Sequence, residues 1–229
     1  PLSFLRVSVF FRVSVLIFSL FKLSTRRIIH YNKIMTNPAA KKEKLEALLR
    51  KCGGGVLVFD HGYHLFSLAY ALMGPVKRVY SWIDHSPIVP GINIDAPATI
   101  MFQFTTPRRY GVLDIEHTPN MRIDSRHYAD DHRIKVIGDK GILFINRYTT
   151  RTVNLPELML FRDGKTTTVP VERVEWEDSF IDCTRHLVEI LRTGGKPRLD
   201  GLTGKAVLQF ALAAQESARI GREVRPYEV

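Results

Sequence analysis

Side chains capable of acid–base chemistry are concentrated in one short stretch of the sequence, from Asp60 to His64. Asp60 and His64 are spaced i, i+4, so a helix that starts here can present both on one face. A carboxylate can orient an imidazole and raise its basicity, and histidine titrates near neutral pH. Gly62 lets a substrate approach the backbone closely. The pairing of Asp60 with His64 therefore suits proton transfer, which makes both of them candidate catalytic residues.

Two other interpretations of this stretch stay open. Asp60 could cap the helix, with His61 and His64 as ordinary polar residues near its start. Asp60, His61 and His64 could instead ligate a metal ion and support a lyase or isomerase reaction. The rest of the sequence supplies no clear further ligand, so we predict no metal site.

A second polar cluster lies between residues 124 and 133. It contains Asp124, Arg126, His127, Asp130, Asp131, His132 and Arg133. We interpret it as a charged surface connection between two strands. The alternative is a loop that borders a substrate cleft.

The net charge of +10 is confined to one end of the sequence. Residues 1–51 hold eleven Lys or Arg and two Asp or Glu, which leaves 22 basic and 21 acidic residues in the remainder. The remainder is nearly neutral, and the basic end has no motif that is known to bind in a groove of DNA or RNA. We therefore expect no nucleic-acid partner. The two cysteines, Cys52 and Cys183, have no disulfide-framework or metal-ligand spacing, which favours a reducing, cytoplasmic location.

The first 34 residues contain a six-residue near-repeat, Phe4–Val9 and then Phe10–Val15, followed by an apolar run to Phe21. That run is too short to cross a bilayer, so we do not expect a membrane protein. Three interpretations stay open: an edge strand, an organelle-targeting or membrane-surface segment, or sequence foreign to the ancestral protein upstream of Met35. With a short helix expected over residues 37–50, we assign residues 1–52 to a basic extension.

Residues 53–229 are predicted to form one α+β domain. Periodicity and Gly/Pro punctuation predict a helix over 62–73 and two more over 178–192 and 203–220. Between them lie strands over 76–83, 96–104, 111–117, 133–137, 141–145, 158–162 and 166–171. Because hairpin signals outnumber strand–helix–strand units, we expect one large, open, mainly antiparallel sheet with helices packed on one face.

Three segments of this domain resemble one oxidoreductase family. Gly-Gly-Gly-Val-Leu-x-x-Asp-x-Gly-x-His, from Gly53 to His64, resembles the signature that opens the C-terminal domain of the Gfo/Idh/MocA (glucose–fructose oxidoreductase and inositol dehydrogenase) family. Residues 137–143, Ile-Gly-Asp-Lys-Gly-Ile-Leu, resemble its hairpin. The tail follows the family too, at residues 178–180, 192–197, 200–201 and 215–222.

The resemblance implies hydride transfer between NAD or NADP and a sugar, polyol or related hydroxyl compound. It also implies that His64 is the proton-transferring group and that Asp60 binds substrate or supports His64. Tyr63 and His61 lie at variable positions of the motif, so they are expected to be substrate-binding residues.

The departures from the family are informative. Its enzymes begin with a Rossmann domain carrying Gly-x-Gly-x-x-Gly, and they have a Glu-Lys-Pro segment, but neither motif occurs here. We therefore expect that this chain does not bind NAD(P) alone and is incomplete for hydride transfer. Its expected partners are a Rossmann domain or a second copy, bound through the sheet face. The alternative is a non-catalytic sheet domain for oligomerisation or small-ligand binding.

Overall fold

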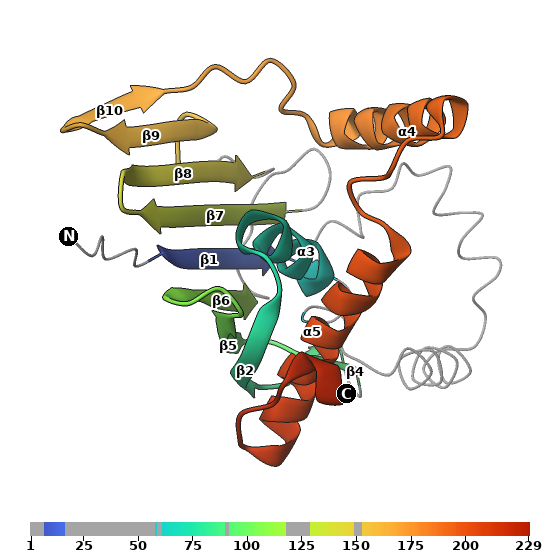
Figure 1. Ribbon diagram of the computed structural model, residues 1–229. Helices are drawn as coiled ribbons and strands as arrows, with labels where there is room; N and C mark the ends of the chain where they lie inside the picture. Colours follow the sequence, from blue (N-terminus) through green and yellow to red (C-terminus); the bar gives the residue numbers. More distant parts are fainter. Residues whose placement is uncertain (1–6, 17–57, 59–60, 90–91, 118–128, 149–152) are drawn as a thin grey trace, which may run out of the picture.

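The computed structural model describes residues 7–16, 58, 61–89, 92–117, 129–148 and 153–229 (Figure 1). The helix expected over residues 37–50 lies outside these ranges. Within them, three α-helices and ten strands confirm the predicted α+β class. The helices are α3 (Gly62–Met73), α4 (Trp176–Thr193) and α5 (Gly201–Ile220), and a 3-10 turn, η3 (Pro226–Glu228), follows α5.

The strands form an eight-stranded sheet and a separate two-stranded one. In the large sheet, β1 (Val7–Leu16) lies between a four-stranded and a three-stranded antiparallel part. The four-stranded part contains β7 (Ala129–Gly138), β8 (Gly141–Tyr148), β9 (Leu158–Arg162) and β10 (Lys165–Thr168). The three-stranded part contains β6 (Arg109–His117), β5 (Ala98–Phe104) and β2 (Val76–Ile83), and the small sheet pairs β3 (Ser86–Val89) with β4 (Ile92–Ile94).

β1 differs from the edge strand that was one of the three interpretations of this segment. It pairs parallel with β6 and antiparallel with β7, so both of its edges are hydrogen-bonded. The alternating pattern in the sequence indicated a strand, but an alternation of side chains carries no information on which strands lie beside it.

One face of the sheet carries α3 and α5 (Figure 1). Phe210 of α5 is fully buried, with its ring centroid 4.5 Å from that of Phe66 in α3 and 4.9 Å from that of Phe102 in β5. Gly111 of β6 makes room for this cluster, because a Cβ there would collide with the Phe102 ring. The core is therefore the layer between this sheet face and the two helices.

The N-terminus of α5 is fixed by a side-chain cap. The carboxylate of Asp200 accepts hydrogen bonds from the backbone N–H of Thr203, at 2.8 Å, and from its hydroxyl, at 2.7 Å. These bonds, with a further contribution from Lys196, lower the pKa of Asp200 below its ordinary value of 3.8. Asp200 thus sets where α5 begins, and α5 in turn holds α3.

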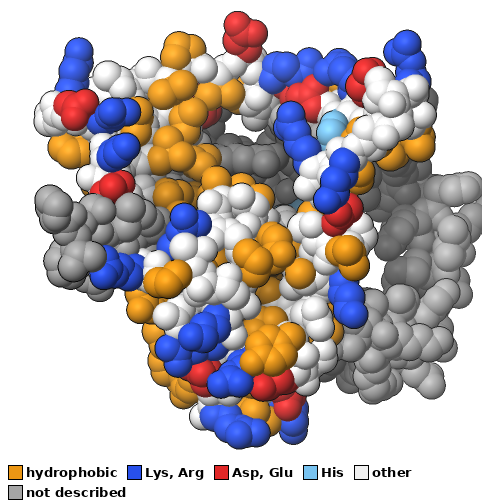
Figure 2. Space-filling model, in the orientation of Figure 1, with side chains coloured by type: hydrophobic (Ala, Val, Ile, Leu, Met, Phe, Trp, Pro, Cys, Tyr) orange, Lys and Arg blue, Asp and Glu red, His pale blue; other side chains and the backbone are white. Residues whose placement is uncertain are grey.

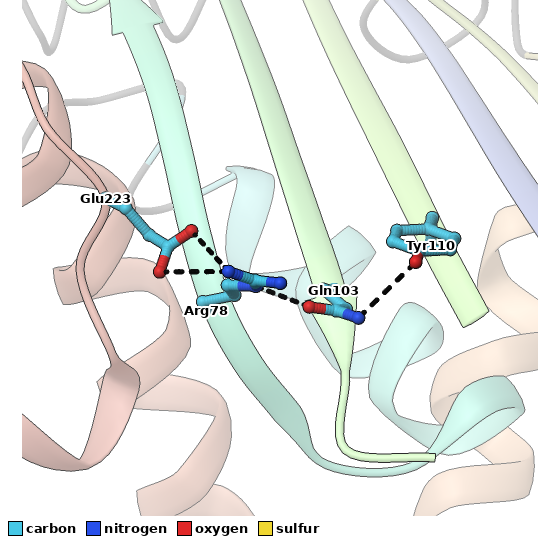
Figure 3. Close-up of polar contacts among 4 residues, drawn as sticks. All are labelled: Arg78, Gln103, Tyr110 and Glu223. Atoms are coloured by element: carbon cyan, nitrogen blue, oxygen red, sulfur yellow. Dashed lines mark hydrogen bonds and ion pairs between the residues drawn. The ribbon is translucent and has the colours of Figure 1, made fainter. Parts of the chain in front are cut away.

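The opposite face of the three-stranded part is open. Trp82, Tyr110 and Met101 are 55%, 47% and 38% exposed, and the Tyr80 and Trp82 rings lie 4.8 Å apart. A row of polar side chains crosses the same face (Figure 3). The guanidinium of Arg78 donates to the carboxylate of Glu223 at 3.1 Å and also to the side-chain oxygen of Gln103. The side-chain amide of Gln103 donates in turn to the Tyr110 hydroxyl. This face therefore combines exposed aromatic rings with an ordered polar row.

α4 lies to the side of the sheet and does not cover it (Figure 1). Its apolar residues follow helical spacing, yet Phe180, Leu187 and Leu191 are 56%, 56% and 75% exposed. Hydrophobic side chains accordingly reach the surface at the upper right of Figure 2, where α4 lies. Despite this apolar face, no helix in the described part of the chain is long and apolar enough to cross a bilayer.

Candidate functional site

The predicted proton-transfer residues lie at the start of α3. The helix buries Leu65, Phe66, Ala69 and Met73, and it ends at Gly74, whose φ of 89° suits glycine, followed by Pro75. His61 is the N-cap residue and His64 lies in the first turn. The spacing of the apolar residues therefore determines where the helix packs, and the helix determines the positions of His61 and His64.

A buried acid holds the segment that enters the helix. Val58 is fully buried, and its backbone N–H donates to the carboxylate of Asp95 at 2.9 Å. Asp95 is itself only 3% exposed and directly follows β4. The small sheet thus positions the chain two residues before Asp60.

Three histidine side chains gather around this helix start. The Nε2 atoms of His61 and His132 are 3.1 Å apart, and their ring centroids are 5.2 Å apart. The His61 and His64 ring centroids are 6.3 Å apart, with the rings nearly perpendicular. His132 comes from β7 and is 9% exposed, whereas His64 is exposed. The site therefore contains a buried imidazole, that of His132, and an accessible one, that of His64.

Tyr63 points toward α5. Its hydroxyl donates to the backbone carbonyl of Gly204 at 3.1 Å, and the side chain is partly buried against the core. This bond connects α3 to α5 next to the histidines. The predicted substrate-binding role of Tyr63 stays a prediction.

Asp60, the predicted partner of His64, lies outside the described residues. The described part of the chain contains no group of three or more His, Cys, Asp or Glu side chains able to hold a metal ion. Of the four predicted site residues, the structure thus brings His61 and His64 together and turns Tyr63 toward α5.

Two residues of this arrangement were not among the predicted site residues. Asp95 was overlooked, although an acid between Ile94 and Ala96 is the kind of isolated charge that often needs a specific partner. His132 was assigned to a loop cluster, but β7 begins at Ala129, so His132 lies within a strand. The sequence did indicate this position, because His132 lies two residues before the apolar Ile134 and alternate residues of a strand share one face.

Replacing Asp95 by alanine is expected to destabilise the protein by about 1–3 kcal/mol, because the buried N–H of Val58 loses its acceptor. Asp95→Asn keeps a side-chain oxygen at this place and should lose less. Urea unfolding followed by circular dichroism measures both free energies of unfolding. Equal losses for the two variants would contradict the assigned role.

Comparisons with known proteins agree with this architecture. Residues 29–228 match the family model described as the C-terminal alpha/beta domain of the Gfo/Idh/MocA oxidoreductase family. A myo-inositol 2-dehydrogenase from Thermotoga maritima is 27% identical over 185 residues, which cover 78% of this chain and 51% of that protein. The chain thus spans about half the length of this relative.

Solved structures share the fold at lower sequence identity. A putative NADPH-dependent oxidoreductase from Desulfitobacterium hafniense matches with a TM-score of 0.65 and 18% identity, over 96% of this chain and 57% of that one. An oxidoreductase from Agrobacterium radiobacter, in complex with NAD+, L-tartaric acid and magnesium, matches with a TM-score of 0.62 and 15% identity, with the same coverage. In both relatives, part of the chain lies outside the region that aligns with this protein.

Proposed function

Because this chain belongs to the Gfo/Idh/MocA oxidoreductase family and matches its C-terminal domain, we propose that it forms the substrate side of an NAD(P)-dependent oxidoreductase. The substrate is a sugar, a polyol or a related hydroxyl compound. The observation that carries the proposal is the exposed His64 in the first turn of α3. The resemblance of residues 53–64 to the family motif implies that this histidine is the proton-transferring group. The likeness to a myo-inositol 2-dehydrogenase supports this substrate class.

In this proposal His64 takes the proton of the substrate hydroxyl. A histidine suits the task because it can accept and release a proton near neutral pH. Its exposure leaves it accessible to a substrate, while the buried Leu65 and Phe66 fix the helix that carries it. Asp60 orients His64 or binds the substrate, and His61 and Tyr63 flank the same site.

The phosphate-binding turn of a Rossmann domain is missing from this sequence. No Gly-x-Gly-x-x-Gly turn occurs in the sequence, and α5 begins on the Asp200 cap instead of a glycine-rich phosphate turn. We therefore assign the NAD(P) site, and with it the hydride carrier, to a separate Rossmann domain.

The apolar face of α4 supports the need for such a partner. Phe180, Leu187 and Leu191 lie along one side of the helix and are each more than half exposed. Exposed apolar patches of this kind mark contact surfaces in soluble proteins. Since the solved relatives carry a further part of about two fifths of their length, we propose that the corresponding domain covers α4.

Complementation tests the function. The chain alone, given NAD+ or NADP+ and a panel of polyols that includes myo-inositol, is expected to show no turnover. Fusing the unmatched part of the Thermotoga maritima relative in front of it should restore nucleotide reduction, measured by absorbance of the reduced nicotinamide. Fluorescence binding of NADH by the fusion is the control for a working cofactor half. A fusion that binds NADH but oxidises no member of the panel would refute the proposal.

The open sheet face favours a second role, association with another copy of the chain. Trp82 of β2, Met101 of β5 and Tyr110 of β6 are exposed on the same face of the sheet. Tryptophan and tyrosine are enriched in protein interfaces. Analytical ultracentrifugation should find a dimer that Trp82→Glu converts to monomer, and a monomeric parent chain would exclude this role. In a non-catalytic protein this association would be the main function.

A further inference from the structure

We propose that Tyr63 is a positioning residue, which holds the first turn of α3 against α5 and thereby keeps His64 in place for proton transfer. The contact that carries this inference is the bond from the Tyr63 hydroxyl to the backbone carbonyl of Gly204, at 3.1 Å. The inference rests on the proposed function for the role of His64 and deepens it. One part of its test needs no enzymatic activity, so the two proposals can fail separately.

The start of α3 is the part of this helix that most needs an anchor. Helix ends fray more easily than the middle of a helix. Further along α3, the buried side chains of Phe66 and Ala69 hold the helix in the core. His64 lies in the first turn and its side chain is exposed, so burial does not fix it. A tertiary contact made by the adjacent Tyr63 therefore limits the movement of His64.

The acceptor of this bond lies in a well-fixed turn of α5. Asp200 caps the helix through the backbone N–H and the hydroxyl of Thr203, and its backbone carbonyl accepts from the N–H of Gly204 at 2.8 Å. Val207, three residues after Gly204, is fully buried. A carbonyl oxygen has two lone pairs, so that of Gly204 can accept both from its own helix and from Tyr63. Tyr63 thus connects the start of α3 to a turn that is itself held on both sides.

The same bond limits what Tyr63 can do for a substrate. A phenolic hydroxyl has one hydrogen, and because a carbonyl can only accept, that hydrogen is used in the bond to Gly204. While the bond is intact, Tyr63 can accept a hydrogen bond from a substrate hydroxyl but cannot donate one. Its ring is also partly buried against the core. These observations favour positioning over substrate binding as the role of Tyr63.

Hydrogen exchange of the full chain, followed by nuclear magnetic resonance, tests the anchor. In Tyr63→Phe the ring keeps its packing and only the hydroxyl is lost. The N–H groups of Leu65 and Phe66 bond to carbonyls four residues earlier, so their exchange reports opening of the first turn. We expect both to exchange about 2- to 10-fold faster, the factor that corresponds to one hydrogen bond. Unchanged exchange rates in Tyr63→Phe would overturn the proposal.

Tyr70→Phe is the matched control for this experiment. Tyr70 is also partly buried against the core, and it lies about two turns further along the same helix. Its substitution removes the same hydroxyl group from a place away from the first turn. The exchange rates of Leu65 and Phe66 should therefore stay at their parent values in Tyr70→Phe.

Steady-state kinetics of the two-domain fusion test the role at the site. We expect Tyr63→Phe to lower kcat by about 2- to 10-fold with KM nearly unchanged, because the proton-transferring group is placed less well while the substrate keeps its contacts. Tyr70→Phe should retain both constants. Parent values of both constants in Tyr63→Phe, or a raised KM at the parent kcat, would overturn the proposal. A fusion without turnover would refute the proposed function, and the exchange rates would still decide whether Tyr63 anchors the helix.

Discussion

In the completed two-domain enzyme, His64→Ala is expected to lower kcat by about 10²–10⁴-fold, the usual contribution of a positioned general acid or base. The methyl group of alanine cannot accept a proton, and the neighbouring rings do not occupy the same place. The centroid of His61 is 6.3 Å from that of His64, and His61 is already engaged with His132. Steady-state kinetics of the fusion, with substrate and nucleotide both varied, measure the loss.

The expected loss should appear in kcat more than in KM, because proton transfer is a property of the transition state. His186→Ala provides the control, since His186 is a partly exposed histidine on α4 whose ring accepts one hydrogen bond from the backbone N–H of Arg198. That variant should retain the parent kcat. If His64→Ala were as active as His186→Ala, the role assigned to His64 would be wrong.

The second large effect concerns the core below the site. Phe210→Ala is expected to destabilise the chain by about 3–5 kcal/mol, the usual range for a fully buried phenylalanine. Its ring contacts Phe66 of α3 and Phe102 of β5, so one truncation opens a cavity where two helices and the sheet meet. Typical domains unfold with only about 5–15 kcal/mol, so the variant should be close to unfolding.

Urea unfolding followed by circular dichroism measures this loss as a lower midpoint with an unchanged slope. Leu208→Ala is the matched control, because Leu208 lies in the same helix and is 39% exposed. It should stay within about 0.5 kcal/mol of the parent. Phe210→Leu gives an intermediate point if Phe210→Ala does not fold. Equal midpoints for Phe210→Ala and Leu208→Ala would show that this cluster does not hold the domain together.

Elements with strong local signals were predictable from the sequence. The structure places α3 over 62–73, as predicted, because Gly74 and Pro75 stop a helix whose apolar residues recur at helical spacing. The hairpin between β7 and β8 was predicted from its Gly138 to Gly141 turn, and Gly138 does pair with Gly141. The resemblance to the family covered the same stretches.

Very short strands and contacts between residues far apart in the sequence were not predictable. The small sheet of β3 and β4 was overlooked because Pro87 and the shortness of both strands weaken the local pattern. The strands that pair with β1 were not predictable either, because they lie about a hundred residues further along the chain. Likewise, the contact of His61 with His132 joins positions 71 apart, and that of Val58 with Asp95 joins positions 37 apart. Spacing along the chain identified the motif but could not identify the residues that fold against it.

The central place of β1 has a consequence for synthesis on the ribosome. Val7 of β1 pairs with Arg109 of β6, and Ser8 pairs with Ile137 of β7, so both partner strands are translated about a hundred residues later. At roughly 5–20 residues per second, the strand waits on the order of 5–20 s for its first partner. During that time its apolar sequence and both of its hydrogen-bonding edges are exposed to other chains. The nascent β1 strand is thus a segment that a ribosome-associated chaperone would protect until β6 and β7 emerge.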